Sequence, residues 1–273
     1  MDKQTEQTII EMYNKRRSLK KIKKAVGISE RLIKKWLIQN HYYNGHRGMA
    51  YYTDEFFFDS IDTEEKAYWL GFIYADGYIS KDHTVGIELK VDDIDHLYKF
   101  QKAVQSELQV KIYNKKSTFG PQTNCRFAFT SKHMSNILLS YFGNIDKTNY
   151  GIFPQLNNTS LIPHLIRGFF DGDGSLSGRP IRDDLLFRPQ ISFIGTQQTL
   201  QYIQDISGFE WSWSQRYPER HTNNYQICCG RVNDSLSFLH YMYDNAHIYL
   251  DRKYNLYQDL LSNRKRNQAK ARV

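Results

Sequence analysis

The sequence contains one phrase twice, WLGFIYADG at residues 69–77 and IRGFFDGDG at residues 166–174. Each copy is largely apolar and has two small residues four positions apart: Gly71 and Ala75, then Gly168 and Gly172. Residues four apart lie on the same face of a helix, so each phrase predicts a helix with one narrow face. Because narrow faces let two helix backbones approach closely, the two phrases predict a pair of helices packed side by side.

Each phrase ends in Asp-Gly, which places Asp76 and Asp173 at the last turn of the two predicted helices. A carboxylate at that end opposes the helix dipole by about 0.3–1 kcal/mol, and two such carboxylates on neighbouring helices also repel each other. A divalent cation between them would resolve the conflict. Asp-Gly is also a common turn pair, but two copies at matched places favour a catalytic role.

The two phrases resemble the paired motifs of the LAGLIDADG homing endonucleases in their single-chain form, and the similarity covers residues 57–262. The resemblance implies an α+β fold with two pseudo-symmetric αββαββα halves packed through the motif helices. It implies that Asp76 and Asp173 bind the catalytic metal, with Mg²⁺ as the cofactor. The implied activity is a double-strand cut by a monomer in a long, asymmetric site of double-stranded DNA, as in intron or intein homing.

The hydrophobic pattern agrees with a duplicated chain. Residues 57–147 and 148–262 each predict the same order of elements: a motif helix, two strands, a helix, two strands and a closing helix. The segments outside these halves are an N-terminal helical unit (1–40), a linker (41–56) and a basic tail (263–273).

The N-terminal unit predicts three short helices, and the last two are joined by the tight turn Gly27–Ser29. Such a pair resembles a helix-turn-helix, in which the helix after the turn reads DNA. The segment is rich in Lys and Arg, so Arg31, Lys34 and Lys35 on the third helix are expected to face outward and bind DNA. A solvated basic helical hairpin is the plainer alternative.

The 273-residue chain has a formal net charge of +8, which favours a polyanionic partner such as nucleic acid. Basic residues on or near the predicted strands are the expected contacts with DNA: Lys111, Lys115, Lys116, Arg126, Arg188, Arg216 and Arg220. Arg and Lys can bind either guanine edges or phosphates, and the pattern does not assign the residues to one or the other.

Three lysines are further candidates for catalysis. Lys147 and Lys253 follow the closing helices of the two halves, where members of the family often have a basic residue near the scissile phosphate. Lys90 ends the strand after the first motif. Their expected role is to orient water or to stabilise charge in the transition state. The place matching Lys90 in the second half is near the apolar Ile194, so the two cutting sites are expected to differ.

Several other classes of protein are disfavoured. Cys125, Cys228 and Cys229 have neither zinc-ligand spacing nor the even count of a disulfide framework, which favours a reducing compartment, the cytoplasm. No apolar run is long enough to predict a membrane span or an export signal. The run DGDGS at 171–175 resembles the start of a calcium loop, but Arg182 occupies the twelfth position, which needs Glu.

Two other functions remain open from the sequence. An intron maturase would bind structured intron RNA without cutting DNA, and a regulator would bind DNA without cutting it. A protein that only binds gains nothing from two carboxylates that repel each other, which is why the endonuclease is the favoured interpretation.

Overall fold

The computed structural model describes residues 1–43, 51–117, 120–181, 186–216, 218–220 and 223–270. The chain forms two compact units, Met1–Asp54 with Gln101–Gln109, and Glu55–Phe100 with Val110–Val273. Part of the predicted linker, residues 44–50, lies outside the described residues. Within the described ranges, no helix has the length and apolar character needed to cross a membrane.

Three helices form most of the first unit: α1 (Lys3–Asn14), α2 (Leu19–Val26) and α3 (Glu30–Gln39). Their shared core consists of Ile9, Tyr13, Ile22, Ile33 and Leu37. The side chain of Ser29 caps α3, and Gly27 ends α2 in the left-handed conformation with φ at 71°. Glycine adopts that conformation without steric cost, so the tight turn between α2 and α3 follows from the sequence.

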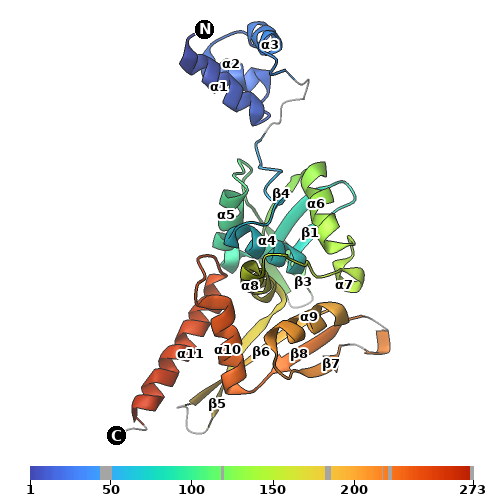
Figure 1. The fold of residues 1–273 in the computed structure, drawn as a ribbon, viewed down its shortest axis with the longest axis vertical. Coiled ribbons are helices and arrows are strands. Elements are labelled where there is room, and N and C mark those ends of the chain that lie inside the picture. Colours follow the sequence, from blue (N-terminus) through green and yellow to red (C-terminus); the bar gives the residue numbers. More distant parts are fainter. Residues whose placement is uncertain (44–50, 118–119, 182–185, 217, 221–222, 271–273) are drawn as a thin grey trace. The chain divides into compact units, whose positions relative to one another are not determined.

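The second unit repeats one series of elements. The first half contains α4 (Glu64–Ala75), β1 (Gly77–Ile79), β2 (Thr84–Lys90), η1 (Val91–Asp93), α5 (Ile94–Ala103), β3 (Lys111–Ser117), β4 (Gly120–Thr130) and α6 (Lys132–Phe142). Between the halves lie α7 (Lys147–Tyr150) and η2 (Thr159–Leu161). The second half contains α8 (Ile162–Asp173), β5 (Ser175–Ile181), β6 (Leu186–Gly195), α9 (Gln197–Ser207), β7 (Ser212–Gln215), η3 (Pro218–Arg220), β8 (Tyr225–Cys229), α10 (Val232–Tyr243) and α11 (Asp251–Lys270). The predicted α+β fold with αββαββα halves is confirmed (Figure 1).

Each half has one antiparallel four-stranded sheet, with strand orders β1-β2-β4-β3 and β5-β6-β8-β7. One face of each sheet is apolar and packs against helices. Phe127 contacts Phe100 of α5 with ring centroids 5.8 Å apart, and Phe193 contacts Phe238 of α10 at 6.0 Å. Because side chains alternate along a strand, the other face of each sheet, called here the outer face, carries the polar residues of the pattern.

The motif helices α4 and α8 pack side by side, as the two narrow faces predict (Figure 1). A Cβ atom built on Gly71 would lie 2.0 Å from the carbonyl oxygen of Leu165, and one on Gly168 would lie 1.9 Å from that of Tyr68. The contact is reciprocal, because each glycine makes room for the backbone of the other helix. These two positions, called the glycine seam below, set the distance between the halves.

One segment differs from the sequence prediction. The segment predicted as a basic tail is helical as far as Lys270, because α11 continues through it. Its buried stripe includes Lys253 as well as Tyr257 and Leu260, and a lysine in the stripe hides the helical period of the apolar residues. The second motif helix begins at Ile162 and has Pro163 in its first turn, where proline fits a helix.

Replacing Gly71 with alanine should lower the free energy of unfolding by about 3 kcal/mol, because the added methyl group must push the motif helices apart. Gly230→Ala is the matched control, since a Cβ atom there meets nothing within 4 Å. Urea unfolding of both variants measures the difference. Equal stability of the two variants would contradict the close approach at the glycine seam.

Candidate active site

The glycine seam brings Asp76 and Asp173 together. Asp76 is the C-cap residue of α4, and Asp173 is the last residue of α8. A Cβ atom on Gly172, the residue before Asp173, would lie 3.4 Å from the carboxyl group of Asp76. The small residue therefore leaves space for one aspartate beside the backbone that carries the other.

Both carboxyl groups are harder to ionise than usual. Burial raises the pKa of Asp76, although Lys253, Lys147 and Arg252 act in the opposite direction. Part of the Asp173 side chain is exposed to solvent, but nearby protein atoms still displace much of the water around its carboxyl group. That desolvation and the charge of Asp76 raise the pKa of Asp173 to about 6. Two carboxyl groups perturbed in this way are typical of a functional site.

A hard divalent cation fits this pair of donors. Carboxylate oxygens are the ligands that Mg²⁺ prefers, and Mg²⁺ usually takes only one or two of them besides water and substrate phosphate. Across the described residues, no cluster of three or more His, Cys, Asp or Glu side chains could hold a metal ion. The pair therefore suits an ion that takes its remaining ligands from water and a substrate.

Lys147 binds the end of the first motif helix. Its ammonium group donates to the carbonyl oxygens of Ile73, Tyr74 (2.8 Å) and Gly77 (2.6 Å). The last carbonyls of a helix have no partner within the helix, so the lysine acts as a cap. Burial lowers the pKa of Lys147 to about 8, while Asp173 and Asp76 favour its charged form.

Lys253 makes the equivalent contacts in the second half. Its ammonium group donates to the carbonyl oxygens of Phe170 (2.5 Å), Asp171 (2.9 Å) and Gly174 (2.5 Å). Burial lowers its pKa to about 8 as well. The sequence predicted that these lysines act on water or on transition-state charge, and that role stays a prediction. In the structure their N–H groups bind backbone carbonyls, which adds a capping function.

The two lysines act across the seam. Among the basic groups that favour the ionised form, Lys147 has the largest effect on Asp173, and Lys253 has the largest effect on Asp76. Each aspartate is therefore influenced most by the lysine that caps the other motif helix. A pocket of about 460 Å³ opens beside Asp173, and Lys147 and Arg216 contribute to its lining.

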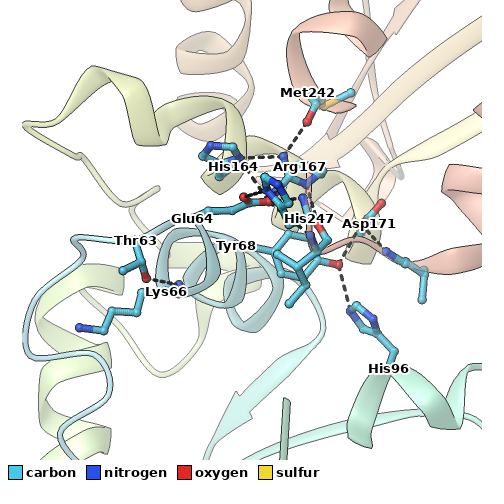
Figure 2. A network of polar contacts seen from close by, with 12 residues as sticks. Thr63, Glu64, Lys66, Tyr68, His96, His164, Arg167, Asp171, Met242 and His247 are labelled. Carbon is cyan, nitrogen blue, oxygen red and sulfur yellow. Dashed lines mark hydrogen bonds and ion pairs between the residues drawn. The ribbon is translucent and has the colours of Figure 1, made fainter. Parts of the chain in front are cut away.

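A buried ion pair links the motif helices to the chain before α11 (Figure 2). Arg167 of α8 is fully buried and donates to Glu64 of α4 at 2.6 Å and to the carbonyl of Met242 at 2.6 Å. Glu64 also accepts from the backbone N–H of His247 at 2.7 Å. Because an unpaired buried charge is strongly unfavourable, these bonds select one arrangement of α4, α8 and the following chain.

Asp171 is a second buried charge at this junction (Figure 2). Its carboxylate accepts hydrogen bonds from Tyr68 (2.8 Å), Tyr243 (2.6 Å) and the backbone of Leu250 (2.8 Å). Burial raises its pKa, and these donors act against that shift. The equivalent residue of the first motif is Tyr74, so the junction at Lys253 is built differently from the one at Lys147.

Sequence reasoning missed Glu64, Arg167 and Asp171 as structural partners. The available signal was the charge itself. Arg167 and Asp171 interrupt an otherwise apolar motif, and charged residues are rarely buried unless they are paired. Which residue pairs with which could not be read, because the partners are distant in the chain.

Lys90 lies exposed at the end of β2, opposite Asn124 in the register. The registers of the two sheets correct its match in the second half, which is Thr196 rather than Ile194. Both matched positions are polar, so Lys90 and Ile194 no longer indicate a difference between the cutting sites. The catalytic role of Lys90 stays a prediction.

The predicted DNA-binding residues of the first sheet fall on two faces. Lys111, Lys115 and Arg126 share the outer face, whereas the alternation along β3 puts Lys116 on the other face. The first three can therefore contact one partner together.

The other predicted contacts are placed as follows. Arg31, Lys34 and Lys35 are exposed on α3. Arg216 lines the pocket beside Asp173. Arg188 lies in β6 and Arg220 in η3, and the positions of their side chains are outside what the structure describes.

Solved structures with the same fold provide the comparison for this site. The LAGLIDADG homing endonuclease I-GzeII, in complex with its DNA target, superposes with a TM-score of 0.51 at 14% identity, covering 78% of this chain and 93% of that chain. The homing endonuclease I-WcaI, bound to its DNA recognition sequence, gives 0.50 at 16% identity, covering 72% and 89%. No protein-family model and no curated protein matches the sequence.

Lys253→Met should lower the free energy of unfolding by about 3 kcal/mol, because it leaves buried carbonyl groups without a donor. Lys132→Met removes an exposed lysine at the start of α6 and is the control, with an expected change within about 0.5 kcal/mol. Chemical denaturation compares the two. A similar small change in both variants would contradict the capping function.

Asp173→Asn should stabilise the metal-free protein at pH 7 and have little effect near pH 4. The folded protein binds a proton at Asp173 up to a pKa of about 6, against an ordinary value of 3.8, so the wild type loses stability as the pH rises through this window. Asparagine does not ionise and escapes the loss. Thermal unfolding in EDTA at both pH values measures the difference, and a wild type that gains on the variant toward pH 7 would contradict the assignment.

Proposed function

We propose that this chain, which has the fold of the LAGLIDADG homing endonucleases, is an endonuclease that cuts both strands of a long duplex DNA site with Mg²⁺. The observation that carries the proposal is the pairing of Asp76 and Asp173 at the ends of α4 and α8. Folding gains nothing from two carboxylates that repel each other and oppose both helix dipoles. A cation that both carboxylates bind for catalysis would offset their repulsion and explain why both are present.

The outer faces of the sheets offer a surface for duplex DNA. Lys111, Lys115 and Arg126 share one such face, and the chain has a formal net charge of +8. Basic groups gain affinity by displacing counterions from DNA, and strands can enter the major groove. I-GzeII and I-WcaI were solved with DNA bound, which supports the same partner for this chain.

In the proposed reaction Asp76 and Asp173 hold the ion, which when bound supplies positive charge against the phosphate in the transition state. Lys147 and Lys253 fix the helix ends from which the carboxylates project. Lys147 and Arg216 bring two positive groups to the pocket beside Asp173, which Asp146 also lines, and these two groups would face a phosphate bound there. Two unlike sites in one monomer suit an asymmetric target, with one cut in each strand.

The first unit contributes a second contact with DNA in this proposal. α2 and α3 join through the left-handed turn at Gly27, as in a helix-turn-helix. The exposed side chains of Arg31, Lys34 and Lys35 then lie on the helix that such motifs place in the major groove.

The test is a selection of bound duplexes from a random pool, with Ca²⁺ present instead of Mg²⁺, followed by addition of Mg²⁺. Wild-type protein should cut both strands of the selected duplex. Asp76→Asn and Asp173→Asn should still bind and should lose cleavage by at least about 100-fold, as expected when a metal ligand is removed. Lys132→Gln, a change on an exposed helix, should cut like the wild type.

Two results would contradict the proposal. Selection of a duplex that is never cut would indicate a DNA-binding regulator. Failure to select any duplex, together with tight binding to a structured intron RNA, would indicate a maturase.

A further inference from the structure

The outer faces of the two sheets match in position and differ in chemistry. Glu88 lies opposite Arg126 in the first sheet, and Ile194 lies opposite Gln226 in the second. The two pairs occupy matching places in their sheets. Gly77 and Gly174 each follow a motif aspartate, and each lies opposite a residue of the next strand. Glu88 in β2 and Ile194 in β6 are each one residue beyond that opposite position. A direct comparison of the two halves is therefore possible at this point.

In the first half this place holds a charged cluster. Glu88 accepts hydrogen bonds from Asn124 (2.9 Å) and Lys115 (3.2 Å). A hydrogen bond with the hydroxyl of Tyr113 is the main cause that lowers the pKa of Glu88, so the carboxylate is ionised at neutral pH. The guanidinium of Arg126 lies over the ring of Tyr113, 5.8 Å from its centroid. Both charges are thus held in place on the outer face before any partner binds.

In the second half the equivalent pair carries no charge. Ile194 and Gln226 are both half-buried on the outer face, and the exposed Ser214 lies opposite Gln226 on the next strand. Arg216, at the place that matches Tyr113, lines the pocket beside Asp173, and so does Ile194. An apolar side chain and an amide therefore replace a carboxylate and a guanidinium.

We propose that the two halves read different base pairs at this place: Glu88 and Arg126 read a C·G pair, and Ile194 and Gln226 read a T·A pair. The proposal rests on the proposed function as a DNA endonuclease. In the major groove a carboxylate accepts from the amino group of cytosine, and arginine donates to guanine, which is the partner base. An apolar group contacts the methyl group of thymine, and glutamine binds adenine, again the partner base.

The geometry of an antiparallel sheet supports this reading. Residues directly opposite each other have Cβ atoms about 4.5–5.5 Å apart, so both can reach the edge of the same base pair. In each of the two residue pairs, one residue suits one base of a base pair and the other residue suits its partner base. Since the groups of the Glu88 cluster already hold one another in place, they lose little conformational freedom when they bind.

The test exchanges the two pairs. Glu88→Ile with Arg126→Gln removes one negative and one positive charge, so the net charge and the non-specific attraction to DNA stay the same. In the Ca²⁺ selection this double variant should prefer T·A over C·G at one position, with a change in preference of about tenfold or more. The reverse exchange, Ile194→Glu with Gln226→Arg, should create a C·G preference in the other half of the site.

Glu210→Ile with Arg231→Gln is the matched control. It removes an exposed ion pair of 3.0 Å by the same two kinds of substitution, and it should leave every base preference unchanged. The single variant Glu88→Gln keeps the shape of the side chain and should relax discrimination only at the cytosine, which gives a second readout if the double variant unfolds.

The outcomes separate this inference from the proposed function. A wild-type protein that selects and cuts a duplex, but whose base preferences are unaffected by either exchange and by Glu88→Gln, would overturn the inference alone. A wild-type protein that selects no duplex would overturn the proposed function as well.

Discussion

The close approach of two helix backbones at Gly71 and Gly168 is the constraint on which the rest of the structure depends. Each glycine accommodates a carbonyl group of the other helix where any side chain would collide. Because closely packed atoms leave almost no free space, the position of one helix fixes the position of the other. The ends of α4 and α8, the two aspartates and the two sheets are all placed relative to this one contact.

The charged residues around the glycine seam form a second system, in which two lysines compensate for two unfavourable aspartates. Asp76 and Asp173 are unfavourable at the helix ends, and burial raises the pKa of both carboxyl groups. Lys147 and Lys253 place positive charge at the same helix ends and donate hydrogen bonds to the last carbonyl groups. Positive groups at the C-terminal end of a helix are favourable, so the lysines offset part of what the aspartates cost.

The two halves share one frame and differ in the residues around it. The second motif has Asp171 in a buried network, whereas the first has Tyr74 at the same point. On the outer faces, a charged pair in one sheet corresponds to an uncharged pair in the other. The frame is symmetric because backbone packing demands it, and the surfaces differ because nothing in that packing constrains them.

The sequence by itself determined the motif helices, their partnership, the αββαββα order and the place of Asp76 and Asp173, since these follow from local periodicity and from a repeated phrase. It also singled out Lys147 and Lys253 as candidates. Only the tertiary structure decided that these lysines cap helices, that Arg167 pairs with Glu64, and that Lys90 matches Thr196. Such facts depend on which distant segments meet, and the distance between two side chains in space is not encoded in their spacing along the chain.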